Sequence, residues 1–424
     1  MFCGLGRAWF GMLDGFKDRT AIVGIGQTRF GGHPPGRPPE HPVESGKELA
    51  CRAVLAALED AGIDPGEVDA LASYTLEETD EVELAAALGL GDLTWFSRTG
   101  YGGGGSCATV AQLAAAIAAG QATVGVAWRS RRRGPRGRPW QAPGAAAEPR
   151  PGPAQPRQGG ERQPVAAQWT RPFGLLRPAD EVAMLTRRYL HEYGATRDHL
   201  FNVALACRNR ANQNPAAIMY ERPLTREMYM DARWISEPLC LYDNCLDTDG
   251  ALACVVVGAE RARDCPRRPV LVHAATQSLP PLHHGMVDYW CEDPLASPGW
   301  TAAHTLWKNA DLTPEEIDCA QMADAFTPQV LFTLEAYGFC GRGEGGAFTE
   351  GGALELGGRL PVNTGGGGLS EGYLHGFNHI TEAVRQLRGD STAQVPGASS
   401  ALVTAGECVP TSALILRAGE GGRR

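Results

Sequence analysis

Hydrophobic positions in the chain alternate between short apolar runs and stretches with helical spacing. The apolar run 20–26 precedes the stretch 44–61, whose apolar residues repeat at helical spacing, and a predicted strand at 68–73. A helix at 302–310 and a strand at 317–322 follow the same order later in the chain. Strands that alternate with helices predict a layered α/β fold whose sheet is covered on both faces. Further strands are predicted at 124–128, 251–257, 269–275 and 401–404.

One helix-to-strand linker occurs twice. Residues 61–69, AGIDPGEVD, match residues 310–318, ADLTPEEID, at an offset of 249 positions. In both copies a capping residue, Asp64 or Thr313, stands ahead of a proline that suits the first turn of a helix. Two independently optimised turns would share this chemistry, but duplication explains the match better. We therefore expect two related halves.

The stretch 129–164 interrupts this pattern. It is rich in Arg, Pro, Gly, Ala and Gln and has almost no aliphatic side chains, so it buries too little apolar surface to order itself. We expect a disordered loop, and without interleaved aromatic residues a basic nucleic-acid tail is the weaker alternative. Regular pattern resumes with a helix at 178–193. The expected organisation is a disordered extension (1–18), a first half (19–268) with an inserted region (129–240), and a second half (269–418).

Composition limits the partners and the location. With 424 residues, 43% hydrophobic and 21% charged, the chain suits two domains or one large duplicated fold. A formal charge of −9 argues against nucleic acid or an anionic membrane as a bulk partner, and no run reaches the roughly 18 apolar residues of a membrane span. Twelve cysteines without a CxxC pair indicate reduced thiols in the cytoplasm. The spacings of Cys240, Cys245 and Cys254 fit no common zinc pattern, so we expect no bound metal.

A glycine-rich stretch at 363–379, NTGGGGLSEGYLHGFNH, is the strongest sign of a functional site. Glycines let a backbone approach a ligand closely, and the stretch runs into a helical pattern at 380–387 whose first amides can face an anion. Tyr373 and His375 stand two positions apart before this helix. Both face one cavity only if the loop is irregular, and otherwise one of them is structural. The loop residues expected to contact the ligand are Gly366, Gly367, Gly368 and Ser370.

Two further residues are candidates for chemistry. Cys107 follows four glycines and a serine at the start of an alanine-rich helix, 108–119, where the helix dipole and unpaired amides would lower the pKa of its thiol. The alternative is a small buried packing residue. Asp324 follows the predicted strand 317–322, where open α/β sheets place their ligand sites. An isolated acid at that position also suits the cap of a helix at 330–337.

Together these features resemble the thiolase superfamily. The shared marks are the duplicated α/β pattern with an excursion in its first half, the Gly-Ser-Cys that ends at Cys107, the turn DTDGA at 247–251, and Ser-Glu-Gly-x-x-x-Gly at 370–376. Over about residues 19–417 the chain looks most like bacterial thiolase-like lipid-transfer proteins and steroid side-chain aldolases. The resemblance implies a thiolase fold of two duplicated βαβαβαββ-type halves, a coenzyme A thioester substrate without a permanently bound cofactor, and a homodimer.

Carried over position by position, this match is partial. Cys107 falls on the cysteine that forms the acyl-enzyme in thiolases, whereas Tyr373 stands where their catalytic histidine would be. The sequence from Ala323, Ala-Asp-Ala-Phe, falls on their Asn-Glu-Ala-Phe, so the asparagine that holds the oxyanion water is missing. Their second cysteine would lie near Val403, and the nearest thiol here is the displaced Cys408.

These changes favour a lyase. Thiolysis needs a nucleophile, a base, an oxyanion site and a proton source, whereas retro-aldol cleavage of a β-hydroxyacyl-CoA forms no acyl-enzyme. A tyrosine can transfer the proton there if its neighbours tune its pKa of about 10. We therefore expect Tyr373 to serve in retro-aldol cleavage of a bulky steroid or lipid side-chain thioester. In the aldolase branch a second tyrosine precedes the acid of the Asp-x-Phe-Thr pattern, where this chain has Ala323. Either His375 or Asp324 substitutes for it, or the activity is reduced.

Two alternatives remain open at this point. A true thiolase, an acyl-CoA C-acyltransferase, would use Cys107 as its nucleophile. A non-catalytic lipid-transfer or scaffold protein would bind acyl-CoA without turnover. The aldolase relatives also pair with a small OB-fold protein that bears a zinc ribbon and completes the substrate channel, and the resemblance implies such a partner for this chain.

Overall fold

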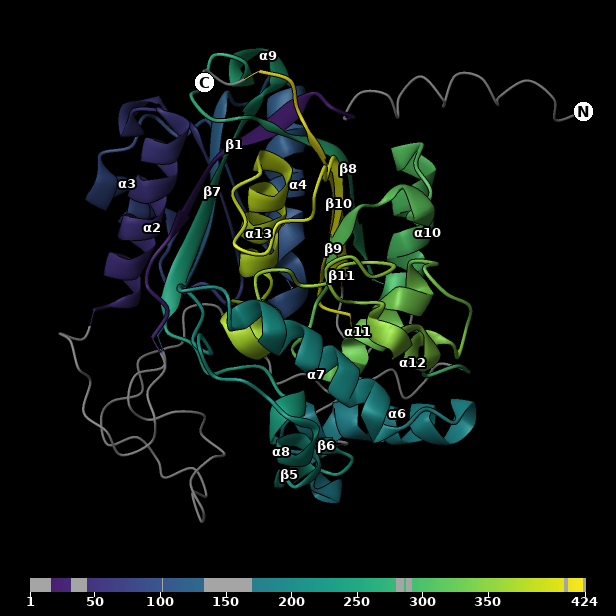
Figure 1. Cartoon of the computed structure of the whole chain (residues 1–424). Helices are drawn as coiled ribbons and strands as arrows, with labels where there is room; N and C mark the ends of the chain where they lie inside the picture. Colours follow the sequence, from purple (N-terminus) through teal and green to yellow (C-terminus); the bar gives the residue numbers. More distant parts are fainter. Residues whose placement is uncertain are drawn as a thin grey trace, which may run out of the picture.

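The computed structural model describes residues 17–31, 44–100, 102–132, 170–279, 286, 292–407 and 411–421. The expected N-terminal extension up to residue 16, residues 133–164 of the expected loop and Cys408 lie outside these ranges. The described part is built on a nine-stranded mixed sheet (Figure 1). Its strands are β1 (Thr20–Gln27), β2 (Ala70–Tyr74), β3 (Trp95–Thr99), β4 (Val124–Arg131), β7 (Gly250–Gly258), β8 (Val270–Ser278), β9 (Cys319–Gln321), β10 (Ser400–Ala405) and β11 (Thr411–Ala418).

The sheet has the same strand order in both directions from its centre. From β1 outward the first half runs β7, β4, β2 and β3, and from β8 outward the second half runs β11, β10 and β9. In each half the two inner pairs are antiparallel and the outer pairs are parallel. A parallel bridge between Ala320 and Val362 takes the place that β3 has in the first half. Antiparallel pairing of β1 with β8 joins the two halves. Their matching strand order confirms the predicted duplication.

The repeated linker has the same structure in both halves. Each copy forms a short 3-10 turn, Pro65–Glu67 and Pro314–Glu316, between the first helix of its half and the following strand. In the first copy the Asp64 amide donates to Glu67 Oε1 at 3.1 Å. In the second the Thr313 amide donates to Glu316 Oε2 at 2.8 Å. The same reciprocal use of a glutamate therefore fixes the strand that follows in each half.

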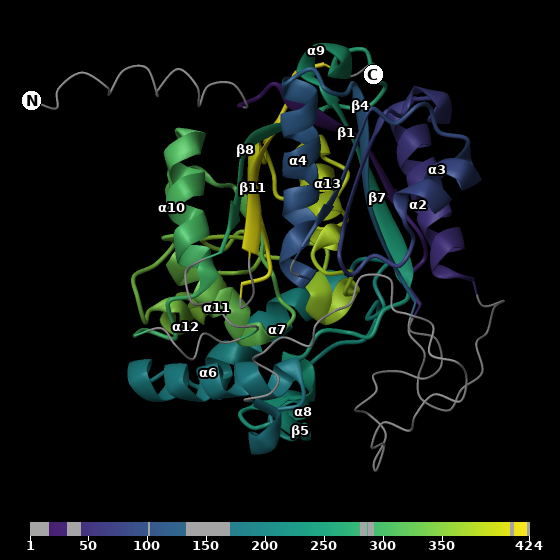
Figure 2. The ribbon, with the colours of Figure 1, turned by 180° about the vertical axis from the view of Figure 1, so that it is seen from behind.

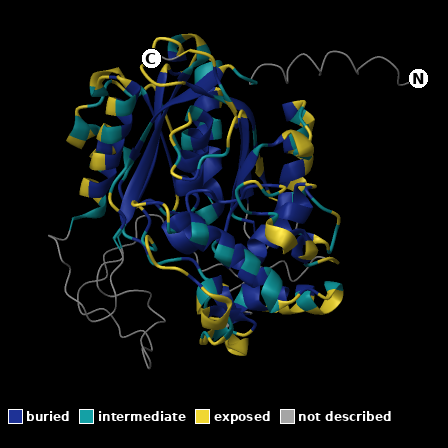
Figure 3. Cartoon of the chain, in the orientation of Figure 1, coloured by how far each residue is buried: buried dark blue, intermediate teal, exposed yellow. Residues whose placement is uncertain are grey.

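Helices form three layers around the sheet (Figures 1 and 2). α2 (Gly46–Ala61) and α3 (Glu81–Leu88) cover the first half from outside, and α10 (Pro298–Ala310) covers the second. α4 (Ser106–Ala118) and α13 (Phe377–Arg388) lie between the halves and contact strands of both. Figure 3 shows that this middle layer and the inner strands of the sheet are largely buried, while the outer helices expose one face.

The alternation of side chains along β7 explains these layers. In a strand, successive side chains point to opposite faces of the sheet. One set of β7 residues packs against α2, and the alternate set packs against α4 and α13. The first set is Ala251, Ala253, Val255 and Val257, and the second is Leu252, Cys254 and Val256. Both faces are apolar because both are covered by helices, as the near-continuous apolar run 251–257 predicts.

A helical region follows the gap in the first half and lies at the end of the sheet where the loops gather (Figure 1). Its first helix, α6 (Pro178–Tyr193), has the bounds that the sequence predicts. The other elements here are α7 (Arg197–Ala211), α8 (Arg226–Met230) and the ribbon of β5 (Trp234–Ser236) and β6 (Leu239–Cys240). The remaining helices are α9 (Ala259–Ala262), α11 (Thr327–Ala336) and α12 (Gly345–Phe348).

The predicted start of the inserted loop at Arg129 is wrong. Arg129, Ser130 and Arg131 are the last residues of β4, where they pair with the start of β7, and all three are buried. Arginine is almost never buried unless it is paired. The residue types therefore indicated a loop, although the strand continues through them. Both Arg129 and Arg131 lie at the candidate site.

Candidate active site

A largely apolar cavity of about 230 Å³ lies where the glycine-rich loop, the end of β4 and the start of α6 meet. Of the residues predicted from sequence, Tyr373, His375 and Asp324 lie on its wall. Gly103, at the entry to α4, and Arg131 lie there too. Apolar side chains on the wall include Leu76, Ile235, Met286 and Phe326. Cys107 and the four predicted ligand residues of the loop are not among the described residues that line it.

Tyr373 is fixed through its main chain. Its amide donates to Thr248 Oγ at 2.8 Å, and its carbonyl accepts from Arg131 at 2.9 Å. Thr248 belongs to the predicted turn DTDGA. The Arg131 guanidinium lies 5.5 Å from the centre of the Tyr373 ring, and a β-carbon on Gly103 would lie 3.7 Å from the Tyr373 hydroxyl. The Tyr373 hydroxyl therefore lies close to the start of α4, a helix of the first half, inside the cavity.

His375 shares this cavity because the loop is irregular. Its φ angle is +54°, which turns the backbone so that its ring meets the Tyr373 ring edge-on, with centroids 4.9 Å apart. Arg129 Nε donates to His375 Nδ1 at 3.2 Å. Arg129 in turn forms a buried ion pair with Glu77, with 3.4 Å between NH1 and Oε2. Sequence reasoning missed both partners, because neither stands in a recognisable pattern.

Asp324 anchors the glycine-rich loop. Its carboxylate accepts from the amides of Gly368 (2.8 Å) and Leu369 (3.3 Å). It also pairs with His379 Nε2 at 3.0 Å and accepts from the Cys207 thiol at 3.7 Å. With four donors around a buried carboxylate, Asp324 is a structural acceptor at the cavity wall rather than a free acid.

The glycines of the loop are explained by this anchor. A β-carbon on Gly367 would lie 2.1 Å from Asp324 Oδ2, and one on Gly368 would lie 2.9 Å from Oδ1. A β-carbon on Gly366 would lie 2.8 Å from the Ala211 side chain. Ser370 accepts from Arg208 Nε at 3.1 Å, inside the protein. These residues therefore fit the π-helical turn Gly367–Glu371 against the protein itself, and their contact with a ligand stays a prediction.

Cys107 is buried and hydrogen-bonded to the second half. Its thiol has no exposed surface and donates to the Val403 carbonyl at 3.7 Å. Burial raises the pKa of this thiol, because the thiolate would lose its hydration. The predicted lowering of its pKa at a helix start is therefore wrong, and the packing alternative describes Cys107 better. A thiol in this state is a poor nucleophile.

Metal clusters, disulfides and membrane-spanning helices are not found among the described residues. No three His, Cys, Asp or Glu side chains in these ranges gather as metal ligands. The nine cysteines that the structure describes are all free thiols. None of the described helices has the length and apolar character needed to cross a membrane.

Comparison with known proteins gives matches that span both halves. Residues 284–417 match the thiolase C-terminal domain-like family. A 17-hydroxy-3-oxo-4-pregnene-20-carboxyl-CoA lyase of Mycobacterium tuberculosis is 44% identical over 409 residues, 96% of this chain and 100% of that protein. A steroid side-chain-cleaving aldolase of Thermomonospora curvata is 45% identical over 402 residues, 94% of this chain and 98% of that protein. The solved Ltp2-ChsH2(DUF35) aldolase superposes with a TM-score of 0.84 at 43% identity, covering 95% of this chain and 98% of that chain.

Proposed function

The chain belongs to the thiolase superfamily, in its branch of steroid side-chain-cleaving aldolases, and we propose that it cleaves a C–C bond of a bulky β-hydroxyacyl-CoA by a retro-aldol reaction. The observation that carries this proposal is that a phenol, and not the cysteine thiol, lines the cavity. Tyr373 lies on the wall of the cavity, whereas Cys107 is fully buried and its pKa is raised. A steroid side-chain thioester suits the apolar lining.

The proposed reaction needs no second substrate. Tyr373, as its phenolate, accepts the proton of the substrate β-hydroxyl, and that oxygen becomes a ketone as the Cα–Cβ bond breaks. The electron pair of this bond passes to Cα and forms the enolate of the thioester, which takes up at Cα the proton that Tyr373 returns. The positive charge of Arg131, 5.5 Å from the ring centre, favours negative charge on the phenol oxygen. The products are a ketone and a shorter acyl-CoA.

The first prediction separates the aldolase from a true thiolase. The purified chain, with its partner protein, should release a ketone and a shorter acyl-CoA from a β-hydroxyacyl-CoA without added CoA. Replacing Cys107 by alanine should change kcat/KM by less than about tenfold, because the thiol does not line the cavity. Liquid chromatography with mass spectrometry measures both products. A Cys107→Ala variant that loses a CoA-dependent cleavage of β-ketoacyl-CoA would favour the thiolase.

We further propose that this chain works with a second protein in the cytoplasm. The similar solved aldolase carries a name with two components, Ltp2-ChsH2(DUF35), which supports a partner protein. We propose that this partner is a small OB-fold protein with a zinc ribbon. The nine free thiols suit a reducing compartment. Turnover by the chain alone at the rate of the pair would show that the partner is not required.

The edge strand β3 supports a homodimer. β3 pairs with β2 on one side and forms the end of the sheet, and its Phe96 is 68% exposed. An edge strand that exposes an aromatic side chain can pair with another chain, and two-fold symmetry would place β3 beside β3 of a second copy. Phe96→Glu should therefore convert a dimer to a monomer in size-exclusion chromatography with light scattering. Leu55→Glu, at an exposed position of α2, is the matched control and should leave the dimer intact. A Phe96→Glu variant that remains dimeric would contradict this interface.

A further inference from the structure

We propose that Glu77 and Arg129 are positioning residues that hold His375 as a neutral imidazole with its proton on Nε2, so that His375 donates a hydrogen bond to the thioester oxygen as the enolate forms. The role of the donor rests on the proposed aldolase function. The state of the ring does not, because it follows from contacts within the chain. His375 lies on the cavity wall, and Glu77 and Arg129 lie behind it.

The contact between Arg129 and His375 determines which nitrogen carries the proton. A guanidinium has donors and no acceptor, so the Nδ1 atom that faces Arg129 Nε at 3.2 Å must present its lone pair. In a neutral imidazole the proton is then on Nε2. A protonated ring would bring a second positive charge, and a second donor, against the guanidinium. Its electrostatic cost therefore disfavours the imidazolium.

Arg129 has little freedom to move away from this contact. Its exposed fraction is 3%. The guanidinium donates to the Leu76 carbonyl, pairs with Glu77 and lies 5.5 Å from the centre of the Tyr74 ring. Glu77 is held by the amides of Ser130 (2.6 Å) and Thr79 (3.0 Å) and by the Ser130 hydroxyl. These donors hold the Glu77 carboxylate in place, and its ion pair orients the arginine toward His375.

The described acids near the ring pair with arginines. The described charged and titratable groups around His375 are two cations on β4, two acids, and two phenols. These groups are Arg129, Arg131, Glu77, Asp247, Tyr74 and Tyr373. Glu77 pairs with Arg129, and Asp247 lies 3.8 Å from Arg131, so the direct contact that determines the state of the ring is that of Arg129 with Nδ1. His379 and Asp324, further along the wall, pair with each other.

A neutral Nε2–H donor supplies what the enolate requires. Negative charge develops on the thioester oxygen as the C–C bond breaks, and a pre-oriented donor stabilises it. Asp324 is unsuited to this role, because its oxygens accept from four donors. Triosephosphate isomerase uses a neutral histidine in the same way to polarise a carbonyl. The fixed tautomer also means that Nδ1 of His375 is not a base for the substrate.

The direct test is nitrogen NMR of the full-length chain with ¹⁵N-labelled histidine, with His375 assigned from its loss in His375→Asn. The ring should remain in the neutral Nε2–H form from about pH 5 to 8. A ring protonated on Nδ1, or one that titrates near its ordinary pKa of about 6.5, would overturn the proposal. This readout needs no substrate, so its outcome is separate from that of the proposed reaction.

A double variant tests the link to catalysis. Removing Arg129 alone would leave Glu77 buried without its cationic partner, so the double variant Glu77→Gln/Arg129→Gln neutralises both residues. Circular dichroism checks that the variant folds. His375 should then titrate, and kcat/KM should fall roughly 10- to 100-fold below pH 6, with an acidic limb that the wild type lacks. The exposed pair Arg187 and Glu237, changed in the same way, should leave the profile unaltered. A folded double variant with the wild-type pH profile would overturn the assignment.

Discussion

Replacing Tyr373 by phenylalanine should lower kcat for the cleavage by about 10²- to 10⁴-fold, the range that a proton-transfer group contributes, while KM changes little. The variant removes one oxygen and keeps the ring. The loop should keep its shape, because Tyr373 is fixed by main-chain bonds to Thr248 and Arg131. Steady-state kinetics on a β-hydroxyacyl-CoA, combined with a single-turnover measurement, separates the chemical step from binding.

The matched control is Tyr220→Phe. Tyr220 is 37% exposed and does not line the cavity, so its loss should leave kcat unchanged. Urea denaturation of both variants should give free energies of unfolding within about 0.5 kcal/mol of the wild type. If Tyr373→Phe keeps kcat within threefold of the wild type, the phenol is not the proton-transfer group, and the proposed mechanism fails.

The fold could be predicted from sequence where local pattern determines it. The apolar runs and the helical spacing of α2 and α6 are local signals, and the repeated linker revealed the duplication. The expected thiolase fold is confirmed by the match to the solved aldolase. The end of β4 was missed, because the ion pair that allows Arg129 to be buried joins residues 52 positions apart. Single-sequence patterns carry no information on such a partner.

The candidate site could also be predicted only in part, because contacts between residues far apart in the sequence determine the rest. The irregular glycine-rich loop pointed to Tyr373 and His375, and the strand end pointed to Asp324. The glycine pattern predicts contact with a ligand, but it cannot show that Gly367 and Gly368 also leave room for Asp324. The thiol of Cys107 was expected to be activated by its helix start. Its actual state depends on β10, whose Val403 carbonyl accepts from it, and on burial by the second half.

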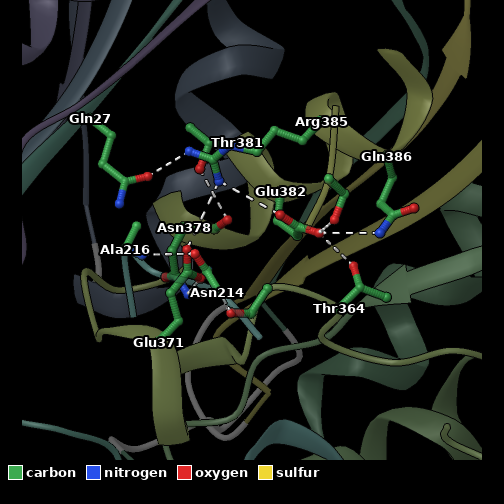
Figure 4. A network of polar contacts seen from close by, with 12 residues as sticks. Gln27, Asn214, Ala216, Thr364, Glu371, Asn378, Thr381, Glu382, Arg385 and Gln386 are labelled. Atoms are coloured by element: carbon green, nitrogen blue, oxygen red, sulfur yellow. Dashed lines mark hydrogen bonds and ion pairs between the residues drawn. The ribbon is translucent and has the colours of Figure 1, made fainter. Parts of the chain in front are cut away.

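Glu371, a buried residue behind the glycine-rich loop, should make the stability of the protein depend strongly on pH. Glu371 ends the π-helical turn and lies in a network with Glu382 and Arg385 (Figure 4). Arg385 NH1 lies 3.6 Å from Glu382 and 3.9 Å from Glu371, so one cation serves two acids. Loss of hydration on burial raises the pKa of Glu371 to about 8, although Arg385 opposes the shift. Glu371 is therefore mostly protonated at neutral pH, and Arg385 balances Glu382.

This shift should make the stability of the protein fall as pH rises. Between the ordinary glutamate pKa of 4.5 and about 8, the unfolded chain has released the Glu371 proton and the folded chain keeps it. The free energy of unfolding should therefore drop by about 1.4 kcal/mol per pH unit from this group and level off above about pH 8. Glu371→Gln keeps an uncharged side chain of the same shape and should remove this slope.

The expected result is a variant whose advantage over the wild type grows by about 4 kcal/mol between pH 5 and 8. Urea denaturation at several pH values measures this difference. The control is Glu221→Gln, at an exposed position, whose free energy of unfolding should change with pH in parallel with that of the wild type. Because the Asn378 amide donates to Glu371 Oε2 at 3.4 Å, glutamine can keep that bond through its carbonyl oxygen. Parallel curves for Glu371→Gln and the wild type would mean that Glu371 is ionised in the folded protein, with Arg385 shared between two charged acids.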